Sequence, residues 1–135
     1  MKRLVIDLDD TLTIADSTRS YADVEVREDV VARLREYKAQ GFEVVIHTAR
    51  NMRTYAGSVG KITVHTLPVI TEWLQKHDIP FDEIWLGKPW CGKEGFYVDD
   101  KAIRPDEFAR LSYAEICGLV NISPENDPGQ EERQE

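Results

Sequence analysis

The chain has 135 residues, of which 41% are apolar and 31% are charged, and its formal net charge at pH 7 is −8. Its length is that of one domain, and runs such as LVIDL, FEVVIH and EIWLG supply enough apolar side chains for a core, which excludes an intrinsically disordered chain. A strongly acidic surface repels nucleic-acid phosphates and anionic membranes, so we expect neither as a partner.

The cysteines and the first residues bear on the cellular compartment. Cys91 and Cys117 are too few for a disulfide framework and lack zinc-site spacing, which favours ordinary thiols in a reducing compartment. Asp7 interrupts the first apolar run too early for a signal peptide. No segment approaches the ~20 apolar residues of a membrane span. We therefore expect a soluble cytoplasmic protein.

The first half of the chain predicts two strands with one helix between them. Residues 3–8 form a short apolar run with β-branched members, typical of a strand buried on both faces. The polar stretch 11–26 is long enough for a flap but too short for a domain. Residues 27–40 place apolar side chains at helical spacing before Gly41, which favours a helix that ends there. Residues 42–48 form the second predicted strand.

The second half continues the alternation of strands and helices. Residues 49–62 contain two glycines and three cations and are predicted as a loop. A helix over about 66–77 has a proline in its first turn, where a missing N–H costs little. The remaining elements are expected to be a strand at 83–86, a loop at 87–95, a strand at 96–99 and a helical region at 105–118.

Strands that alternate with helices favour an α/β fold with a parallel sheet. We expect one domain over residues 1–120 and a polar, acidic, frayed tail over 121–135. In open sheets of this kind ligands bind beyond the carboxyl ends of the strands. The residues directly after each predicted strand are therefore the candidates for a functional site.

Carboxylates, a hydroxyl and a lysine follow the predicted strands. Taken singly, each has a structural explanation as a turn residue, a cap or a solvated charge. Taken together, like charges at one sheet edge destabilise the fold unless a cation compensates them, and clustered hard oxygen ligands suit Mg²⁺. The sequence therefore predicts a metal-dependent phosphate site. Its candidate residues are Asp7, Asp9, Asp10, Thr48, Lys88, Asp99 and Asp100.

The order of these residues resembles the four motifs of the haloacid dehalogenase superfamily of phosphohydrolases. The motif Asp-x-Asp-x-Thr is matched by Asp7, Asp9 and Thr11, and the Thr or Ser that closes the second strand is matched by Thr48. The lysine motif is matched by Lys88-Pro89 and the paired acids by Asp99-Asp100. The match runs from residue 3 to about 105 in the order of the superfamily. It implies a three-layer, doubly wound parallel sheet, and the acid at position 9 argues against the dehalogenase branch.

The resemblance also implies a mechanism with Mg²⁺ as the cofactor. Asp7 would attack phosphorus and form an aspartyl-phosphate, while Asp9 would protonate the leaving oxygen and then deprotonate the attacking water. Thr48 would bind a phosphoryl oxygen, and Lys88 would offset negative charge. The metal would be held by Asp7, the backbone carbonyl of Asp9 and the pair Asp99-Asp100, either of which is a candidate for the direct ligand.

Other residues and the substrate are less closely determined. Lys93 is the alternative to Lys88 as the site lysine. The stretches between the motifs leave no room for a cap domain, so we expect a site that is open or closed by a neighbouring subunit in a homo-oligomer. The segments 48–74 and 87–105 are similar to the small capless phosphatases of bacterial capsule polysaccharide biosynthesis, which suggests a phosphorylated sugar or related small metabolite. The candidates for substrate binding are Thr11, Ala49, Arg50, Arg53 and Lys61.

Two other functions use similar residues. A receiver-type signalling domain also combines an acidic Mg²⁺ cluster with a hydroxyl and a lysine, but its acceptor aspartate lies at the middle strand, whereas here Thr48 closes the second strand. A phosphotransferase that passes the phosphoryl group to an alcohol needs the same residues as a hydrolase. The order of the motifs favours the phosphohydrolase.

Overall fold

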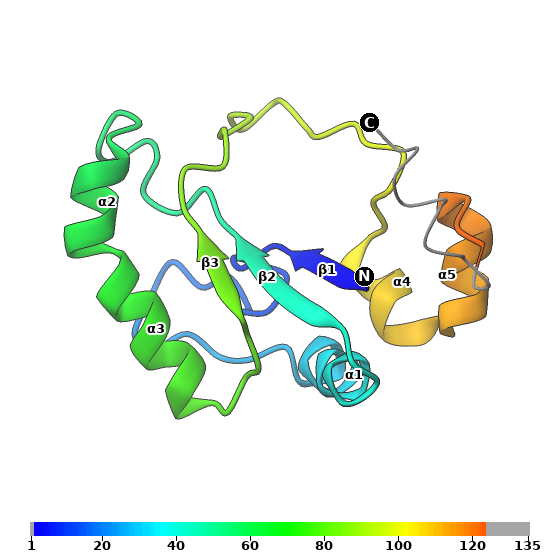
Figure 1. The fold of residues 1–135 in the computed structure, drawn as a ribbon. Coiled ribbons are helices and arrows are strands. Elements are labelled where there is room, and N and C mark those ends of the chain that lie inside the picture. Colours follow the sequence, from blue (N-terminus) through cyan, green and yellow to red (C-terminus); the bar gives the residue numbers. More distant parts are fainter. Residues whose placement is uncertain (1, 124–135) are drawn as a thin grey trace.

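Three parallel strands form the central sheet of the protein, whose computed structural model describes residues 2–123 (Figure 1). The strands are β1 (Arg3–Ile6), β2 (Glu43–His47) and β3 (Glu83–Trp85), in the order β1-β2-β3. Val5 pairs with Val45 and His47 with Trp85, which fixes the register across the sheet. β-Branched side chains are enriched in β1 and β2 because they pack well on a pleated surface. The predicted α/β fold with a parallel sheet is confirmed at this level.

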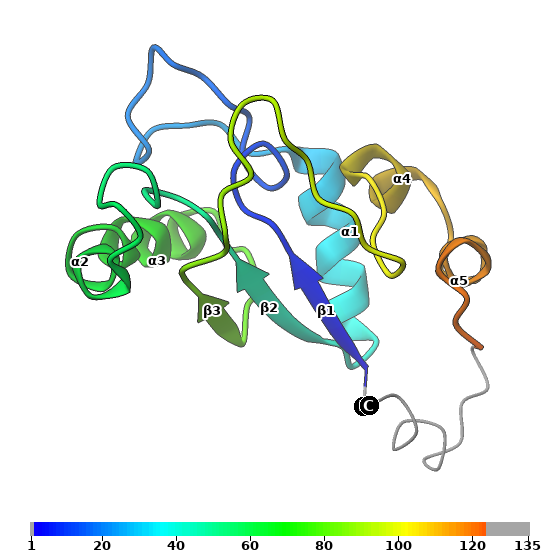
Figure 2. The same ribbon diagram turned by 90° about the horizontal axis from the view of Figure 1, so that it is seen from above.

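Five helices accompany the sheet. They are α1 (Glu28–Ala39), α2 (Val59–His65), α3 (Leu67–Lys76), α4 (Pro105–Arg110) and α5 (Tyr113–Val120). Figure 2 shows that α1 and α3 lie on the same side of the sheet. Each of these two helices has an apolar face, and those faces are buried against the sheet: Val30, Val31, Leu34 and Tyr37 in α1, and Ile70, Trp73 and Leu74 in α3.

The hydrophobic core occupies one face of the sheet. Because side chains alternate along a strand, Ile6, Val44 and Ile46 point to the face that α1 and α3 cover, and all three are buried. On the opposite face, Val5 and Trp85 are more than half exposed. The described residues thus form one layer of sheet with helices against one face, and the expected three-layer arrangement is not seen in this part of the chain.

Three sequence predictions are wrong in detail. The loop expected at 49–62 already contains the start of α2, because the Ser58 side chain accepts the backbone N–H of Lys61 and caps the helix. The helical region expected at 105–118 is two helices, separated at Leu111. The strand expected at 96–99 is not formed, and Phe96 and Val98 are 79% and 88% exposed. Apolar composition alone does not form a strand, because a strand also needs a neighbour to receive its backbone hydrogen bonds.

The segment between β1 and α1 forms a flap with a fixed base. Thr13 and Val26 make an isolated antiparallel bridge, and the N–H of Ile14 donates to the carbonyl of Glu25 at 2.8 Å. The indole Nε1 of Trp73 in α3 donates to the Val24 carbonyl at 3.0 Å. The two ends of the flap, residues 14–24, therefore lie side by side at its buried base. The rest of the flap projects from the molecule as the blue loop in Figure 2.

Three expectations concern the whole chain. The tail expected over 121–135 lies outside the described residues from position 124 onward. No helix of residues 2–123 has the length and apolarity that a membrane crossing requires. Cys91 and Cys117 both carry free thiols, as the sequence predicts.

Candidate active site

The chain makes a tight turn directly after β1, and this turn presents the first motif. The carbonyl of Leu8 accepts the backbone N–H groups of Thr11, Leu12 and Thr13 at 3.3, 2.9 and 3.1 Å. Asp10 adopts a left-handed conformation with φ of 58°, which aspartate tolerates better than most residues. The strand has therefore ended before Asp9, and the turn brings this side chain to Arg50, whereas Asp7 faces Lys88.

Asp7 stands at the carboxyl end of β1 with partners from two other segments. The hydroxyl of Thr11 donates to its Oδ2 at 3.1 Å. The ammonium of Lys88, which follows β3, lies 3.6 Å from its Oδ1. Lys88 also lies 4.4 Å from the ring centre of Tyr97, whose hydroxyl donates to the Pro89 carbonyl at 2.6 Å. The carboxylate of Asp7 is therefore oriented by one hydroxyl and one cation, and it remains partly open to solvent.

Thr48 joins the ends of β2 and β3. Its N–H donates to the Trp85 carbonyl at 3.0 Å, and its own carbonyl accepts the N–H of Lys88 at 3.1 Å. These two bonds continue the parallel ladder beyond the assigned strands. Lys88 therefore lies at the same edge of the sheet as Asp7, which follows β1. The buried hydroxyl of Thr48 accepts the N–H of Arg50 at 3.1 Å, so its proton is still available for donation to a ligand.

Asp9 is held by a buried arginine. The Arg50 guanidinium donates through Nη2 to Oδ1 of Asp9 at 2.7 Å and through Nε to Oδ2 at 3.2 Å. The Arg50 side chain is 1% exposed, whereas that of Asp9 is 37% exposed. Tyr21 of the flap covers the guanidinium, with its ring centre 4.0 Å from Cζ. Sequence reasoning missed Tyr21; the one aromatic side chain of the flap, residues 14–24, is the signal that could have identified it.

His47 precedes Thr48 and has a lowered pKa. Burial lowers the pKa of His47, the nearby Lys88 ammonium lowers it further, and the Asp7 carboxylate partly opposes both effects. Burial also raises the pKa of Tyr97, whose hydroxyl lies beside Cys91. Lys88 is thus the cation next to Asp7, while Lys93, its alternative, is exposed.

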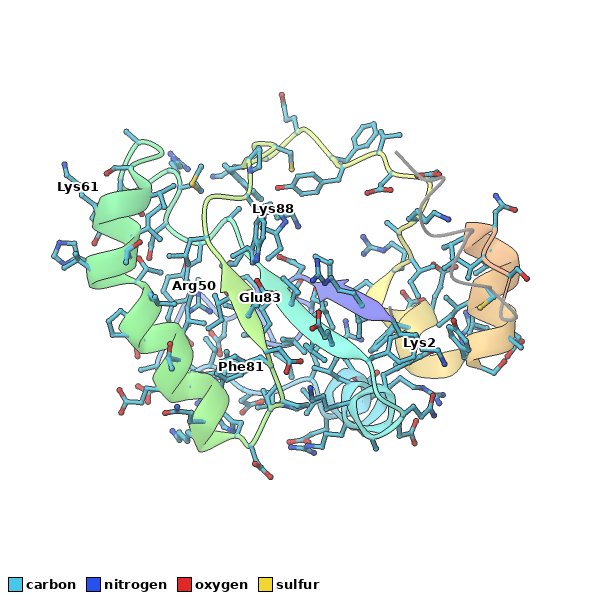
Figure 3. The ribbon with its side chains drawn as sticks, in the orientation of Figure 1. Lys2, Arg50, Lys61, Phe81, Glu83 and Lys88 are labelled. Atoms are coloured by element: carbon cyan, nitrogen blue, oxygen red, sulfur yellow. The ribbon has the colours of Figure 1, made fainter. Side chains whose placement is uncertain are left out.

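The structure does not gather every predicted site residue. Arg53 and Lys61 are exposed, and Figure 3 shows Lys61 on the outer side of α2, away from Arg50 and Lys88. Ala49 lies between Thr48 and Arg50 and is half-buried. Asp99 and Asp100 are exposed on the long segment after β3, where Asp99 accepts the N–H of Lys101 at 2.8 Å.

The donor atoms fit Mg²⁺ in part. No three acidic, histidine or cysteine side chains within residues 2–123 form a group that could hold a metal ion. Mg²⁺ commonly takes only one or two carboxylates and completes its shell with water and substrate oxygens. Asp7, with a partly exposed carboxylate at the sheet edge, fits the first of these ligands. The pair at 99–100 forms no such group with Asp7 and Asp9 among the described residues.

Comparisons with known proteins agree with the fold. No family model matches the chain, and no curated protein matches it. A target protein from Vibrio cholerae of known crystal structure is 59% identical, with a TM-score of 0.86. The match covers 90% of this chain and 98% of the Vibrio cholerae chain. The chain therefore belongs to the same family as this Vibrio cholerae protein.

Proposed function

We propose that the protein is a Mg²⁺-dependent phosphohydrolase of the haloacid dehalogenase superfamily, which cleaves a phosphate monoester through an aspartyl-phosphate. One observation carries the proposal. Asp7 lies at the carboxyl edge of a parallel sheet, 3.1 Å from the Thr11 hydroxyl and 3.6 Å from the Lys88 ammonium, with the buried Thr48 at the end of the neighbouring strand. This arrangement supports a nucleophilic carboxylate that is oriented by a hydroxyl and whose negative charge is offset by a cation.

In the first step an oxygen of Asp7 attacks phosphorus, so that an O–P bond forms and the P–O bond to the leaving group breaks. Asp9 gives its proton to the leaving oxygen. In the second step Asp9 accepts a proton from water as the water oxygen attacks phosphorus, and the bond to Asp7 breaks to release phosphate.

The remaining residues act on charge and orientation. Lys88 offsets the negative charge of Asp7 and of the phosphoryl group as they approach each other. The Thr48 hydroxyl donates to a phosphoryl oxygen. The lowered pKa of His47 disfavours a second cation beside Asp7. Asp7 and the backbone carbonyl of Asp9 would hold Mg²⁺, with the 99–100 pair as the candidates for its further carboxylate. When bound, Mg²⁺ supplies neutralisation of charge on the transferring group.

We infer a small phosphorylated metabolite, such as a phosphorylated sugar, as the substrate, from the resemblance to the small capless phosphatases. The net charge of −8 disfavours nucleic acid as an alternative. The exposed side chains of Val5 and Trp85 on the open face of the sheet are consistent with a homo-oligomer.

The test is phosphate release from a panel of sugar phosphates, nucleotides and an aryl phosphate, with Mg²⁺ and with EDTA. We expect release that requires Mg²⁺ and is lost in Asp7→Asn, because an amide cannot act as the nucleophile. Lys2→Gln, at a cation distant from the sheet edge, is the matched surface control (Figure 3). Full Mg²⁺-dependent turnover by Asp7→Asn would contradict the proposed mechanism.

A further inference from the structure

The two side chains of the Arg50–Asp9 ion pair differ in their exposure to solvent, and this difference bears on the reaction. Arg50 is almost fully buried and Asp9 is more than one third exposed. Both hydrogen bonds that the Arg50 side chain makes go to Asp9, and its third nitrogen, Nη1, is buried without a hydrogen-bond partner among residues 2–123. The arginine is therefore the fixed member of the pair, and the carboxylate is the member that reaches solvent and substrate.

The ring of Tyr21 packs against the Arg50 guanidinium. Its ring centre lies 4.0 Å from Cζ of Arg50, a distance at which the ring face attracts a cation. The flap that carries Tyr21 has its base fixed by the bridge between Thr13 and Val26 and by the bond from Trp73 to Val24. Arg50 is thus packed between the flap and the turn after β1.

The two bonds to Asp9 differ in length, and the difference distinguishes the two oxygens. Nη2 lies 2.7 Å from Oδ1, whereas Nε lies 3.2 Å from Oδ2. This two-pronged contact fixes the plane of the Asp9 carboxylate relative to the buried guanidinium, with the shorter bond at Oδ1.

We propose that Arg50 and Tyr21 are positioning residues for the acid–base group: Arg50 holds the Asp9 carboxylate in one orientation through two hydrogen bonds, and the Tyr21 ring holds the Arg50 guanidinium in place from the flap. This inference rests on the proposed function, because it assigns an orienting device to the residue that moves the proton. It predicts that the flap affects proton transfer without contacting the phosphoryl group.

Two substrates of nearly the same shape test this inference. Phenyl phosphate expels a basic phenolate and needs a proton from Asp9, whereas p-nitrophenyl phosphate expels a stable anion and needs little help. The quantity measured is kcat/KM with Mg²⁺, which reports the steps up to departure of the leaving group and not the later attack of water. We expect Arg50→Lys, which keeps the charge but loses the two-pronged geometry, to lower kcat/KM for phenyl phosphate by about 10- to 100-fold and for p-nitrophenyl phosphate by less than about threefold.

Further variants separate positioning from general damage. Tyr21→Ala should shift the ratio of the kcat/KM values for the two substrates in the same direction as Arg50→Lys. Tyr21→Phe, which keeps the ring face, should leave this ratio as in the unaltered protein. In an Asp9→Asn background Arg50→Lys should cost nothing further, because residues that act through one another are not additive. Arg35→Lys is the matched control, since Arg35 donates to the His77 and Asp78 carbonyls outside the site.

The possible results are distinct. Selective loss on phenyl phosphate that disappears in the Asp9→Asn background supports the inference. Equal loss on both substrates, or full additivity with Asp9→Asn, overturns the inference and leaves the proposed function standing. Absence of Mg²⁺-dependent release from both substrates by the unaltered protein overturns the proposed function and the inference with it.

Discussion

Replacement of Trp73 by phenylalanine tests whether the base of the flap contributes to stability. Trp73 lies in α3, is 2% exposed, and donates its indole N–H to the Val24 carbonyl, 49 positions earlier in the chain, at 3.0 Å. Trp73→Phe keeps one six-membered ring and removes the N–H and the rest of the indole. Among the described residues, no other donor contacts the Val24 carbonyl.

The expected loss follows from two contributions. A buried carbonyl that loses its partner costs about 1–3 kcal/mol. The space left by the smaller ring costs about 1–2 kcal/mol more, since complete truncation of a buried tryptophan to alanine costs ~3–5 kcal/mol. The free energy of unfolding should therefore fall by roughly 2–5 kcal/mol, a large part of the ~5–15 kcal/mol typical of a small domain.

Urea unfolding followed by far-ultraviolet circular dichroism measures this loss without relying on tryptophan fluorescence, which the substitution itself changes. The matched control is Trp90→Phe, because Trp90 is largely exposed and its replacement should change stability by no more than about 0.5 kcal/mol. If Trp73→Phe were as stable as Trp90→Phe at an unchanged denaturant slope, the bond to the flap base would contribute nothing and our account of the flap would be wrong.

Three further predictions concern charge. Hydrogen bonds from Lys38 and from a backbone N–H of β2 lower the pKa of Asp82. The contribution of Asp82 to stability is therefore present above the ordinary aspartate pKa and is lost as the pH falls below about 4. Asp82→Asn should flatten the acid side of the curve of Tm against pH. Lys88→Met should reduce turnover by roughly 100-fold, whereas Lys93→Met should stay within about twofold, and the reverse order would transfer the role to Lys93. Neutralising both acids at 99–100 as asparagines should raise the Mg²⁺ concentration for half-maximal activity by about tenfold; an unchanged requirement would remove that pair from the metal site.

The elements that carry the core could be predicted from the sequence. The run Val44-Val45-Ile46 is apolar and β-branched, and α1 repeats its apolar residues at helical spacing before Gly41. Both patterns arise from burial, and burial is the strongest constraint that a fold places on its sequence. The positions directly after these strands could also be predicted, because the carboxyl ends of parallel strands meet at one edge. Asp7 and Lys88 come together there as expected.

Contacts made by exposed or irregular segments could not be predicted. Phe96–Val98 has the composition of a strand, yet its conformation depends on whether another strand receives its hydrogen bonds, and no local pattern encodes that neighbour. The contact between Tyr21 and Arg50 joins two loops almost thirty positions apart, and neither residue has a periodic pattern around it. Ser58 is the exception, since a serine before Val59 is a recognisable cap that the glycines on either side obscured.

The two acids of the first motif are held by different kinds of structure, and this difference has consequences for the proposed reaction. Asp7 faces Lys88, whose backbone is tied to Thr48 and through it to the β2–β3 ladder, so the nucleophile and its cation are parts of the sheet. Asp9 is fixed only by side chains, through Arg50 to Tyr21 on the flap. Sheets open far less often than loops do. Motion of the flap should therefore disturb proton transfer while leaving the nucleophile in place, which makes the acid–base step the one that a flap contact can regulate.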